Sequence, residues 1–136
     1  MALFIISNRL PIKVSKSGND FIYERSEGGL TTGLASLNDF QDRHWIGWPG
    51  IFSDDEQDKK QIESDLSDEK LHPVFLSEDQ ILNYYEGYSN SMIWPLCHYF
   101  YAYIQYETKF WDSYQEVNQL FCDEAVRSEE RRVGKE

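Results

Sequence analysis

Arg9 is the residue of this chain whose type and position best suit the binding of an anion. It follows the apolar run at residues 2–7 and precedes Leu10 and Pro11, so it stands where a buried strand has to end. A guanidinium at the end of a strand can hold a phosphate group through two parallel hydrogen bonds. An ordinary surface salt bridge is the alternative for this residue.

A pair of glycines, Gly28 and Gly29, precedes a segment whose apolar residues at positions 30, 34, 37 and 40 have helical spacing. Glycines let backbone N–H groups approach a phosphate closely, and the start of a helix adds partial positive charge. The residue order is neither that of a dinucleotide-binding loop nor that of a P-loop, and a plain tight turn is the alternative. Together with Arg9, the pair predicts a pocket for a phosphorylated ligand at the carboxyl edge of a sheet.

Aromatic residues interleaved with serine and asparagine occupy residues 83–99, a composition that suits a carbohydrate. Tyr85 and Trp94 are the candidates, because they stand near Gly87 and Pro95, which we expect to break a helix and let side chains face a cleft. The alternative is packing in the core, which we expect for most of the aromatics that follow: Tyr99, Phe100, Tyr101 and Tyr103.

The chain shows no spacing that predicts a nucleophile with its base, a pair of catalytic acids or a metal site. His98 lacks a partner at metal-binding spacing, so we expect a structural role for it. We expect Cys97 and Cys122, which lie far apart, to be buried thiols of a cytosolic protein rather than a disulfide.

Along the chain, predicted strands alternate with predicted helices. Apolar runs predict buried strands at residues 2–7, 44–48 and 71–76, and alternation around a Ser-Gly-Asn-Asp turn predicts a hairpin of 12–16 with 21–24. Predicted helices cover residues 30–40, part of the acidic segment 53–70, a segment from residue 78 capped by Ser77, and residues 108–126. This alternation predicts an α/β fold with a mostly parallel sheet.

The composition excludes several classes of partner. With 24 acidic against 13 basic residues, the net charge of -11 argues against nucleic acid and anionic membranes, since both require a basic face. No apolar run approaches the ~20 residues of a membrane span, and the first residues lack the basic region of a signal peptide. We therefore expect a cytoplasmic protein.

The last residues, 127–136, are polar and lack the periodicity of the preceding helix. They resemble, residue for residue, the in-frame translation of a common sequencing-adapter oligonucleotide. We therefore expect one domain over residues 1–126, incomplete at its C-terminal end, and a non-native tail over 127–136. A genomic copy that continues through the tail would refute this.

Five segments, in this order, resemble the N-terminal part of the trehalose-6-phosphate synthase family: residues 6–11, 27–34, 45–50, 84–99 and 111–118. The resemblance implies part of the Rossmann-like N-terminal domain of a two-domain, retaining glycosyltransferase of the GT-B type. The implied reaction transfers glucose from UDP-glucose to glucose 6-phosphate, giving trehalose 6-phosphate and UDP, without a required metal or other cofactor.

The resemblance also implies roles for particular residues. Arg9 would hold the phosphate of the acceptor, Tyr85 and Trp94 would line the acceptor site, and Trp48 is a weaker candidate nearby. On the donor side, two residues would lie against UDP-glucose, near its diphosphate and its sugar: Gly28 and Gly29.

Other groups that the family uses are absent from these residues. The histidine-aspartate-tyrosine-histidine motif does not occur, and neither do the arginine and lysine that hold the UDP diphosphate, so we expect this chain to be inactive by itself. The alternatives are a related glycosyltransferase with another acceptor, a non-catalytic regulatory or interaction subunit, and a bifunctional protein with a phosphatase domain. A homo-oligomer of the full-length enzyme is compatible with each.

Overall fold

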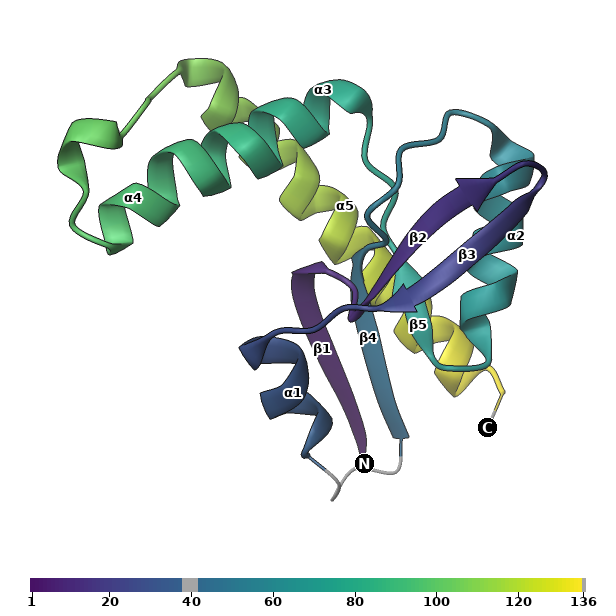
Figure 1. Ribbon diagram of the computed structural model, residues 1–136. Coiled ribbons are helices and arrows are strands. Elements are labelled where there is room, and N and C mark those ends of the chain that lie inside the picture. Colours follow the sequence, from purple (N-terminus) through teal and green to yellow (C-terminus); the bar gives the residue numbers. More distant parts are fainter. Residues whose placement is uncertain (38–41, 136) are drawn as a thin grey trace. The chain divides into compact units, whose positions relative to one another are not determined.

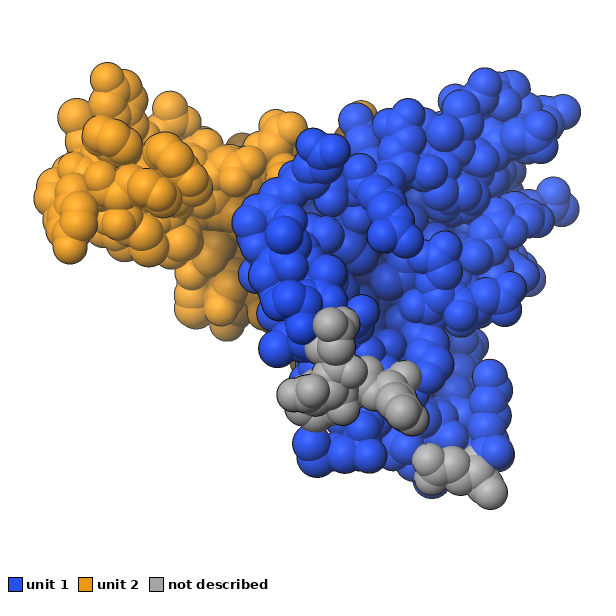
Figure 2. All heavy atoms as spheres, turned by 60° about the horizontal axis from the view of Figure 1, so that its bottom comes forward, with its two compact units in different colours: residues 1–75, 124–136 blue, residues 76–123 orange. Residues whose placement is uncertain are grey.

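The computed structural model describes residues 1–37 and 42–135 and contains two compact units. Unit 1 comprises residues 1–75 and 124–136, and unit 2 comprises residues 76–123 (Figure 2). Apart from α5 (Thr108–Val133), which contributes residues to both units, each unit has its own helices and strands.

Unit 1 is built on a parallel sheet with the strand order β1–β4–β5 (Figure 1). The strands are β1 (Ala2–Arg9), β4 (Asp42–Trp48) and β5 (Leu71–Pro73). The predicted parallel sheet is confirmed. β5 is shorter than predicted and ends at Pro73, whose nitrogen has no hydrogen to donate to a neighbouring strand.

A hairpin and an acidic helix complete the core of unit 1. β2 (Ile12–Ser17) pairs with β3 (Asp20–Arg25) in an antiparallel sheet, which confirms the predicted hairpin. α2 (Glu56–Ser67) begins after Asp55, whose carboxylate accepts a hydrogen bond from the backbone N–H of Gln57. The acidic segment is therefore a helix, as predicted, with a solvated face.

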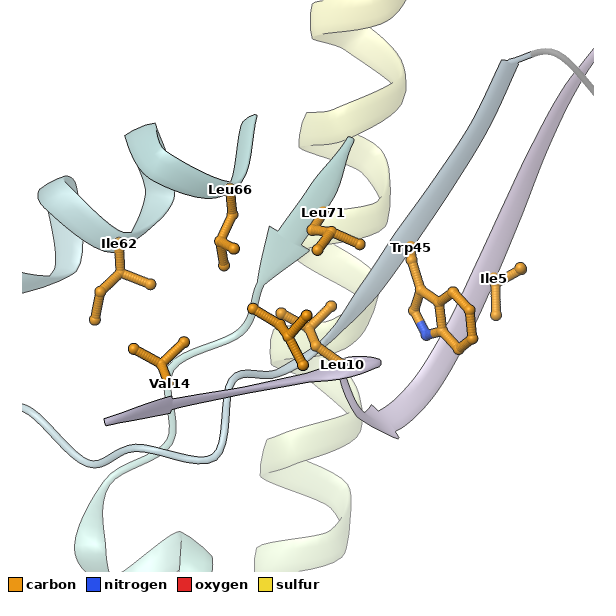
Figure 3. Packing of buried hydrophobic residues seen from close by; sticks show 8 residues of the cluster. Ile5, Leu10, Val14, Trp45, Ile62, Leu66 and Leu71 are labelled. Carbon is orange, nitrogen blue, oxygen red and sulfur yellow. The ribbon is translucent and has the colours of Figure 1, made fainter. Parts of the chain in front are cut away.

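The core of unit 1 lies between the hairpin, the sheet and α2. Ile62 and Leu66 of α2 point toward Val14 of β2 and Leu71 of β5 (Figure 3). The Ile62 side chain is completely buried. Burial of side chains of this kind stabilises a fold by about 1.5–3 kcal/mol each, which fixes α2 despite its many charges.

α1 (Gly29–Ala35) is shorter than the predicted helix over 30–40, and none of its residues is buried. Leu34 of the predicted apolar stripe is partly buried and packs against the core, whereas Leu30 is 61% and Leu37 40% exposed. Phe40, the last residue of that stripe, lies outside the described residues. The Arg43 guanidinium donates a hydrogen bond of 3.1 Å to the carbonyl oxygen of Leu34 and so stabilises the carboxyl end of α1.

Unit 2 begins with a continuous helical segment. It consists of α3 (Glu78–Gln80), the π-wound η1 (Ile81–Ile93) and α4 (Trp94–Cys97). Ser77 caps it as predicted, because its hydroxyl accepts from the Gln80 backbone N–H while the Gln80 side chain accepts from the Ser77 N–H.

The prediction that Gly87 and Pro95 break this helix is wrong. Gly87 is buried inside η1, where a Cβ atom would lie 2.6 Å from two ring carbons of Phe110. The Phe110 ring can pack this closely only because Gly87 has no side chain. The favourable packing outweighs the low helix propensity of glycine. Pro95 lies inside the continuous segment, where η1 passes into α4. It has no N–H to donate to the preceding turn, and the Ser91 carbonyl oxygen, four residues before it, accepts from the Gln105 N–H at 2.9 Å instead.

α5 (Thr108–Val133) is longer than the predicted helix, which ended at Val126. In unit 1, Arg127 and Arg131 of its last turns form ion pairs with Glu63 of α2, at 3.1 and 2.9 Å. A run of charged residues thus adopts helical structure without an apolar periodicity. The non-native origin of residues 127–136 stays a prediction.

Two expectations of burial are wrong. Four aromatics near η2 (Tyr101–Tyr103) are exposed rather than in the core, with fractions from 49% to 79%: Tyr99, Phe100, Tyr101 and Tyr103. Tyr99 ends α4 with a φ of 62°, in the left-handed region, and this turn directs the chain away from the helix into an irregular segment. Cys97 and Cys122 are free, as expected, but exposed.

Candidate functional site

Arg9 lies at the carboxyl end of β1, beside Trp48 at the carboxyl end of β4. The register between the strands shifts from Ile6–Ile46 to Arg9–Trp48, so β1 contains one more residue than β4 over this stretch. Such a bulge bends a strand and changes the direction of the side chain that follows. The predicted position of Arg9 at the carboxyl edge of the sheet is therefore found, and the bulge places Arg9 next to Trp48.

Two side chains hold the bulge. The Trp45 indole N–H donates to the Ser7 hydroxyl at 2.8 Å, and that hydroxyl donates to the Arg9 carbonyl oxygen at 2.6 Å. Ser7 and Trp45 lie within segments 6–11 and 45–50, but this role was not predicted for either, because a serine at a strand end and a tryptophan in an apolar strand have no distinctive spacing. The two residues fix the backbone from which the Arg9 side chain extends.

The guanidinium of Arg9 packs on an aromatic ring rather than on a carboxylate. Its central carbon lies 5.7 Å from the centre of the Trp48 ring, a cation–π contact. The Trp48 side chain is 8% exposed, and its indole N–H donates to the Ile51 carbonyl oxygen at 3.2 Å. Within residues 1–37 and 42–135, Arg9 forms no ion pair, so the alternative of a surface salt bridge is not observed.

The Nε atom of Arg9 is buried and has no hydrogen-bond partner among the described residues. A buried N–H of a charged group without an acceptor costs more than about 1–3 kcal/mol. An anion that accepts from this group would remove that cost. The arrangement is therefore complementary to an oxyanion such as a phosphate.

Gly50, in the loop after β4, lies close to the guanidinium of Arg9. Its φ is 82°, and a Cβ atom there would lie 2.9 Å from Arg9 Nη2. The absent side chain leaves the space that the guanidinium occupies. Gly50 follows the predicted strand at 44–48 and lies in segment 45–50, but no role beside Arg9 was predicted for it.

Gly28 and Gly29 lie at the start of α1 in unit 1. Gly28 precedes the helix in an extended conformation, and its carbonyl oxygen accepts from the Thr32 N–H at 3.0 Å. A Cβ atom at either glycine would meet nothing within 4 Å among the described residues. The backbone at these two glycines therefore has open space around it. A ligand needs such space to approach the backbone N–H groups.

Tyr85 and Trp94 lie in the helical segment of unit 2, nine residues apart. Nine residues make about two and a half turns of an α-helix and would place these side chains on opposite faces. The i→i+5 winding of η1 takes more residues per turn and brings the two positions closer to one face. Helical spacing of 3.6 in the sequence therefore could not show that they belong together.

The surroundings of the two aromatics differ. Tyr85 is partly buried, whereas Trp94 is 51% exposed. The Trp94 ring stacks on the His98 ring with centroids 4.0 Å apart, and His98 Nδ1 lies 2.7 Å from the Trp94 carbonyl oxygen. His98 thus has the structural role that we expected, as a support for Trp94.

Tyr84, next to Tyr85, faces the protein instead. It is 6% exposed, and burial raises the pKa of its hydroxyl. Its ring stacks against Tyr114 of α5 with centroids 6.4 Å apart. Tyr84 therefore anchors the helix and leaves Tyr85 as the less buried member of the tyrosine pair.

The structure brings Arg9 and Trp48 into contact in unit 1, which also holds Gly28 and Gly29, while Tyr85 and Trp94 belong to unit 2. Within the described residues, no group of three or more His, Cys, Asp or Glu side chains has an arrangement that could hold a metal ion. No helix in that part of the chain is long and apolar enough to cross a membrane.

Comparison with known proteins gives one consistent family. The sequence profile described as Glycosyltransferase family 20 matches residues 1–132. The UDP-forming alpha,alpha-trehalose-phosphate synthase of Pichia angusta is 35% identical over 92% of this chain and 27% of its own. The 56 kDa subunit of the Saccharomyces cerevisiae enzyme is 38% identical over 93% and 26%. This chain thus spans about a quarter of the length of these curated relatives.

Solved structures show the same fold. A trehalose-6-phosphate synthase, OtsA, matches with a TM-score of 0.66 and 24% identity, over 93% of this chain and 26% of that chain. A UDP-forming synthase from Burkholderia xenovorans in complex with glucose-6-phosphate matches with a TM-score of 0.64 and 22% identity, over 93% and 25%. These likenesses confirm the predicted fold class, part of the Rossmann-like N-terminal domain of a GT-B glycosyltransferase.

Proposed function

Because this chain belongs to glycosyltransferase family 20, we propose that it forms the acceptor-binding side of a trehalose-6-phosphate synthase. The reaction transfers glucose from UDP-glucose to glucose 6-phosphate and releases UDP. The names of the curated relatives, UDP-forming trehalose-phosphate synthases, favour this activity over a regulatory subunit or an enzyme with another acceptor.

The observation that carries the proposal is the buried, unpartnered Nε of Arg9 beside Trp48. A guanidinium that already has a fixed plane loses little freedom when it forms parallel hydrogen bonds to a phosphate. In this chain, no neighbouring carboxylate within the described residues competes for that position. Arg9 therefore binds the 6-phosphate of the acceptor.

The other site residues complete the two substrate positions. Tyr85 and Trp94 line the acceptor sugar, whose apolar faces suit aromatic rings, and Trp48 supports the phosphate site. Gly28 and Gly29 present backbone N–H groups to the donor, where they stabilise the negative charge that develops on the departing UDP. No side-chain nucleophile is required in this scheme.

Further parts of the proposal concern the full-length enzyme. It is a cytoplasmic protein and needs no metal or other cofactor, and a homo-oligomeric assembly is compatible with this function. The acidic composition supports the absence of a nucleic-acid partner. Cell fractionation and size-exclusion chromatography test the location and the assembly.

A chimera tests the activity directly. Residues 1–126 replace the matching quarter of the Saccharomyces cerevisiae relative, and formation of trehalose 6-phosphate from UDP-glucose and glucose 6-phosphate is measured. We expect an active chimera whose activity falls at least 100-fold on Arg9→Ala, about 2.7 kcal/mol. Loss of activity in the parent chimera while the protein stays folded would contradict the proposal.

The isolated chain gives the complementary test. With both substrates present, it should release no UDP, because the groups that hold the UDP diphosphate lie outside these residues. Clear turnover by the chain alone would show that the donor site is placed incorrectly. Glucose 6-phosphate should nevertheless bind to the chain, weakly, through Arg9.

A further inference from the structure

The stem of a second cationic side chain, Lys13, lies near the Arg9 guanidinium, and this residue was not singled out in the sequence. The position that a Cβ atom of Gly50 would occupy lies 2.9 Å from Arg9 Nη2 and 3.5 Å from Lys13 Cγ. Both side chains therefore border the same small volume, on the side of Gly50 from which a side chain is missing. Arg9 comes from the end of β1, and Lys13 comes from β2.

Neither cation has an anionic partner at ion-pair distance in the described part of the chain, although the protein carries 24 acidic residues. Lys16, on the same strand as Lys13, does form such a pair, with Asp58 at 2.7 Å. Glu24 is the residue opposite Lys13 in the hairpin, but no ion pair forms between them. An anion bound at Arg9 would attract the Lys13 ammonium group, whose stem starts beside this volume.

The chemistry of the acceptor supplies such an anion. A phosphate monoester carries about -1.5 to -2 charges at pH 7, more than a single guanidinium neutralises. The ammonium group of a lysine extends on a flexible stem and can donate to a phosphate oxygen that Arg9 leaves free. Resting on the proposed function of Arg9, we infer that Lys13 is a second phosphate-binding residue, which makes the site selective for a dianion.

The test compares two ligands on the 136-residue chain by calorimetric titration: glucose 6-phosphate, a dianion, and glucose 6-sulfate, a monoanion. Lys13→Gln should weaken binding of glucose 6-phosphate by about fivefold and that of the sulfate by less, so the preference for phosphate decreases. Lys16→Gln is the matched control, with the same charge change on the same strand, and should leave the preference unchanged. Glu24→Gln removes a neighbouring negative charge and should tighten binding of the phosphate.

The outcomes separate the inference from the function on which it rests. If Arg9→Ala abolishes binding of glucose 6-phosphate while Lys13→Gln behaves like Lys16→Gln, the role of Lys13 is refuted and that of Arg9 stands. If the chain does not bind glucose 6-phosphate, or if Arg9→Ala leaves the affinity unchanged, both are refuted. Thermal unfolding of each variant shows that the compared proteins are folded.

Discussion

The guanidinium carbon of Arg9 lies 5.7 Å from the centre of the Trp48 ring, at paired positions where two parallel strands end. The contact fixes the cation without neutralising it, since an aromatic ring attracts a cation but carries no net charge. An arginine paired with a carboxylate would have to exchange that partner for a ligand. Arg9 has only to add a ligand.

Trp48→Phe should weaken binding of glucose 6-phosphate by about two- to fivefold, because phenylalanine offers a weaker cation–π surface than tryptophan. The variant also loses the hydrogen bond from the indole N–H to Ile51, so the free energy of unfolding should fall by about 1 kcal/mol. Calorimetric titration and urea unfolding measure the two effects separately. An unchanged affinity in a folded variant would show that the ring does not position Arg9.

Gly50→Ala should disturb Arg9 directly, because the added Cβ would lie 2.9 Å from Nη2. Gly18→Ala is a matched control: its φ is 63°, also left-handed, but a Cβ there meets nothing within 4 Å. Both variants should lose about 1–2 kcal/mol of stability from backbone strain. Only Gly50→Ala should also weaken binding of glucose 6-phosphate, and equal affinities in the two variants would contradict the account.

Gly87→Ala tests the packing of unit 2. In a helix open to solvent, alanine would stabilise by about 1 kcal/mol over glycine. Here the added Cβ would lie 2.6 Å from the Phe110 ring, so we expect a net loss of stability of about 1–2 kcal/mol. The loss should be smaller in a Phe110→Leu background. A gain of stability on urea unfolding would show that the close contact is absent.

The pair formed by His44 and His72 predicts a dependence of stability on pH. Burial, followed by the neighbouring charge of His44, lowers the pKa of His72 from its usual 6.5 to about 4. Between these values the unfolded chain binds a proton that folded His72 does not, so stability falls as the pH decreases from about 6.5 toward 4. The two rings share a hydrogen bond of 2.9 Å between His44 Nδ1 and His72 Nε2.

His72→Gln serves as the comparison, since carboxylates also contribute to acid destabilisation. The pKa of Asp42, for example, is lowered mainly by its hydrogen bond from Lys70. The free energy of unfolding at pH 7 minus that at pH 5 should be smaller in His72→Gln than in the parent chain. Equal differences would mean that His72 is not held neutral.

Local patterns in the sequence were sufficient for the sheet, the hairpin and the position of Arg9. An apolar run that meets Arg-Leu-Pro has few ways to continue, so the end of β1 follows from the residues themselves. The residues around Arg9 were harder to predict, since Gly50 and Lys13 come close to it only through tertiary contacts. The spacing of residues within one segment does not predict such contacts.

The failures in unit 2 have the same origin. The predicted break in the helix rested on the average helix propensities of glycine and proline. At Gly87, however, packing against the Phe110 ring is more important than propensity. Tyr99 adopts a left-handed conformation that only a minority of tyrosines adopt, so the exposure of the following aromatics was not predictable. The π winding of η1 likewise changed which positions share a face.

The NMR signal of the Arg9 Nε–H group in the isotopically labelled chain reports whether this group binds the phosphate. Glucose 6-phosphate should shift the signal and slow the exchange of its proton with water, whereas glucose should do neither. Titration to about 10 mM covers binding with a Kd near 1 mM. A signal unchanged by glucose 6-phosphate throughout that range would contradict the claim that Arg9 binds the phosphate of the acceptor.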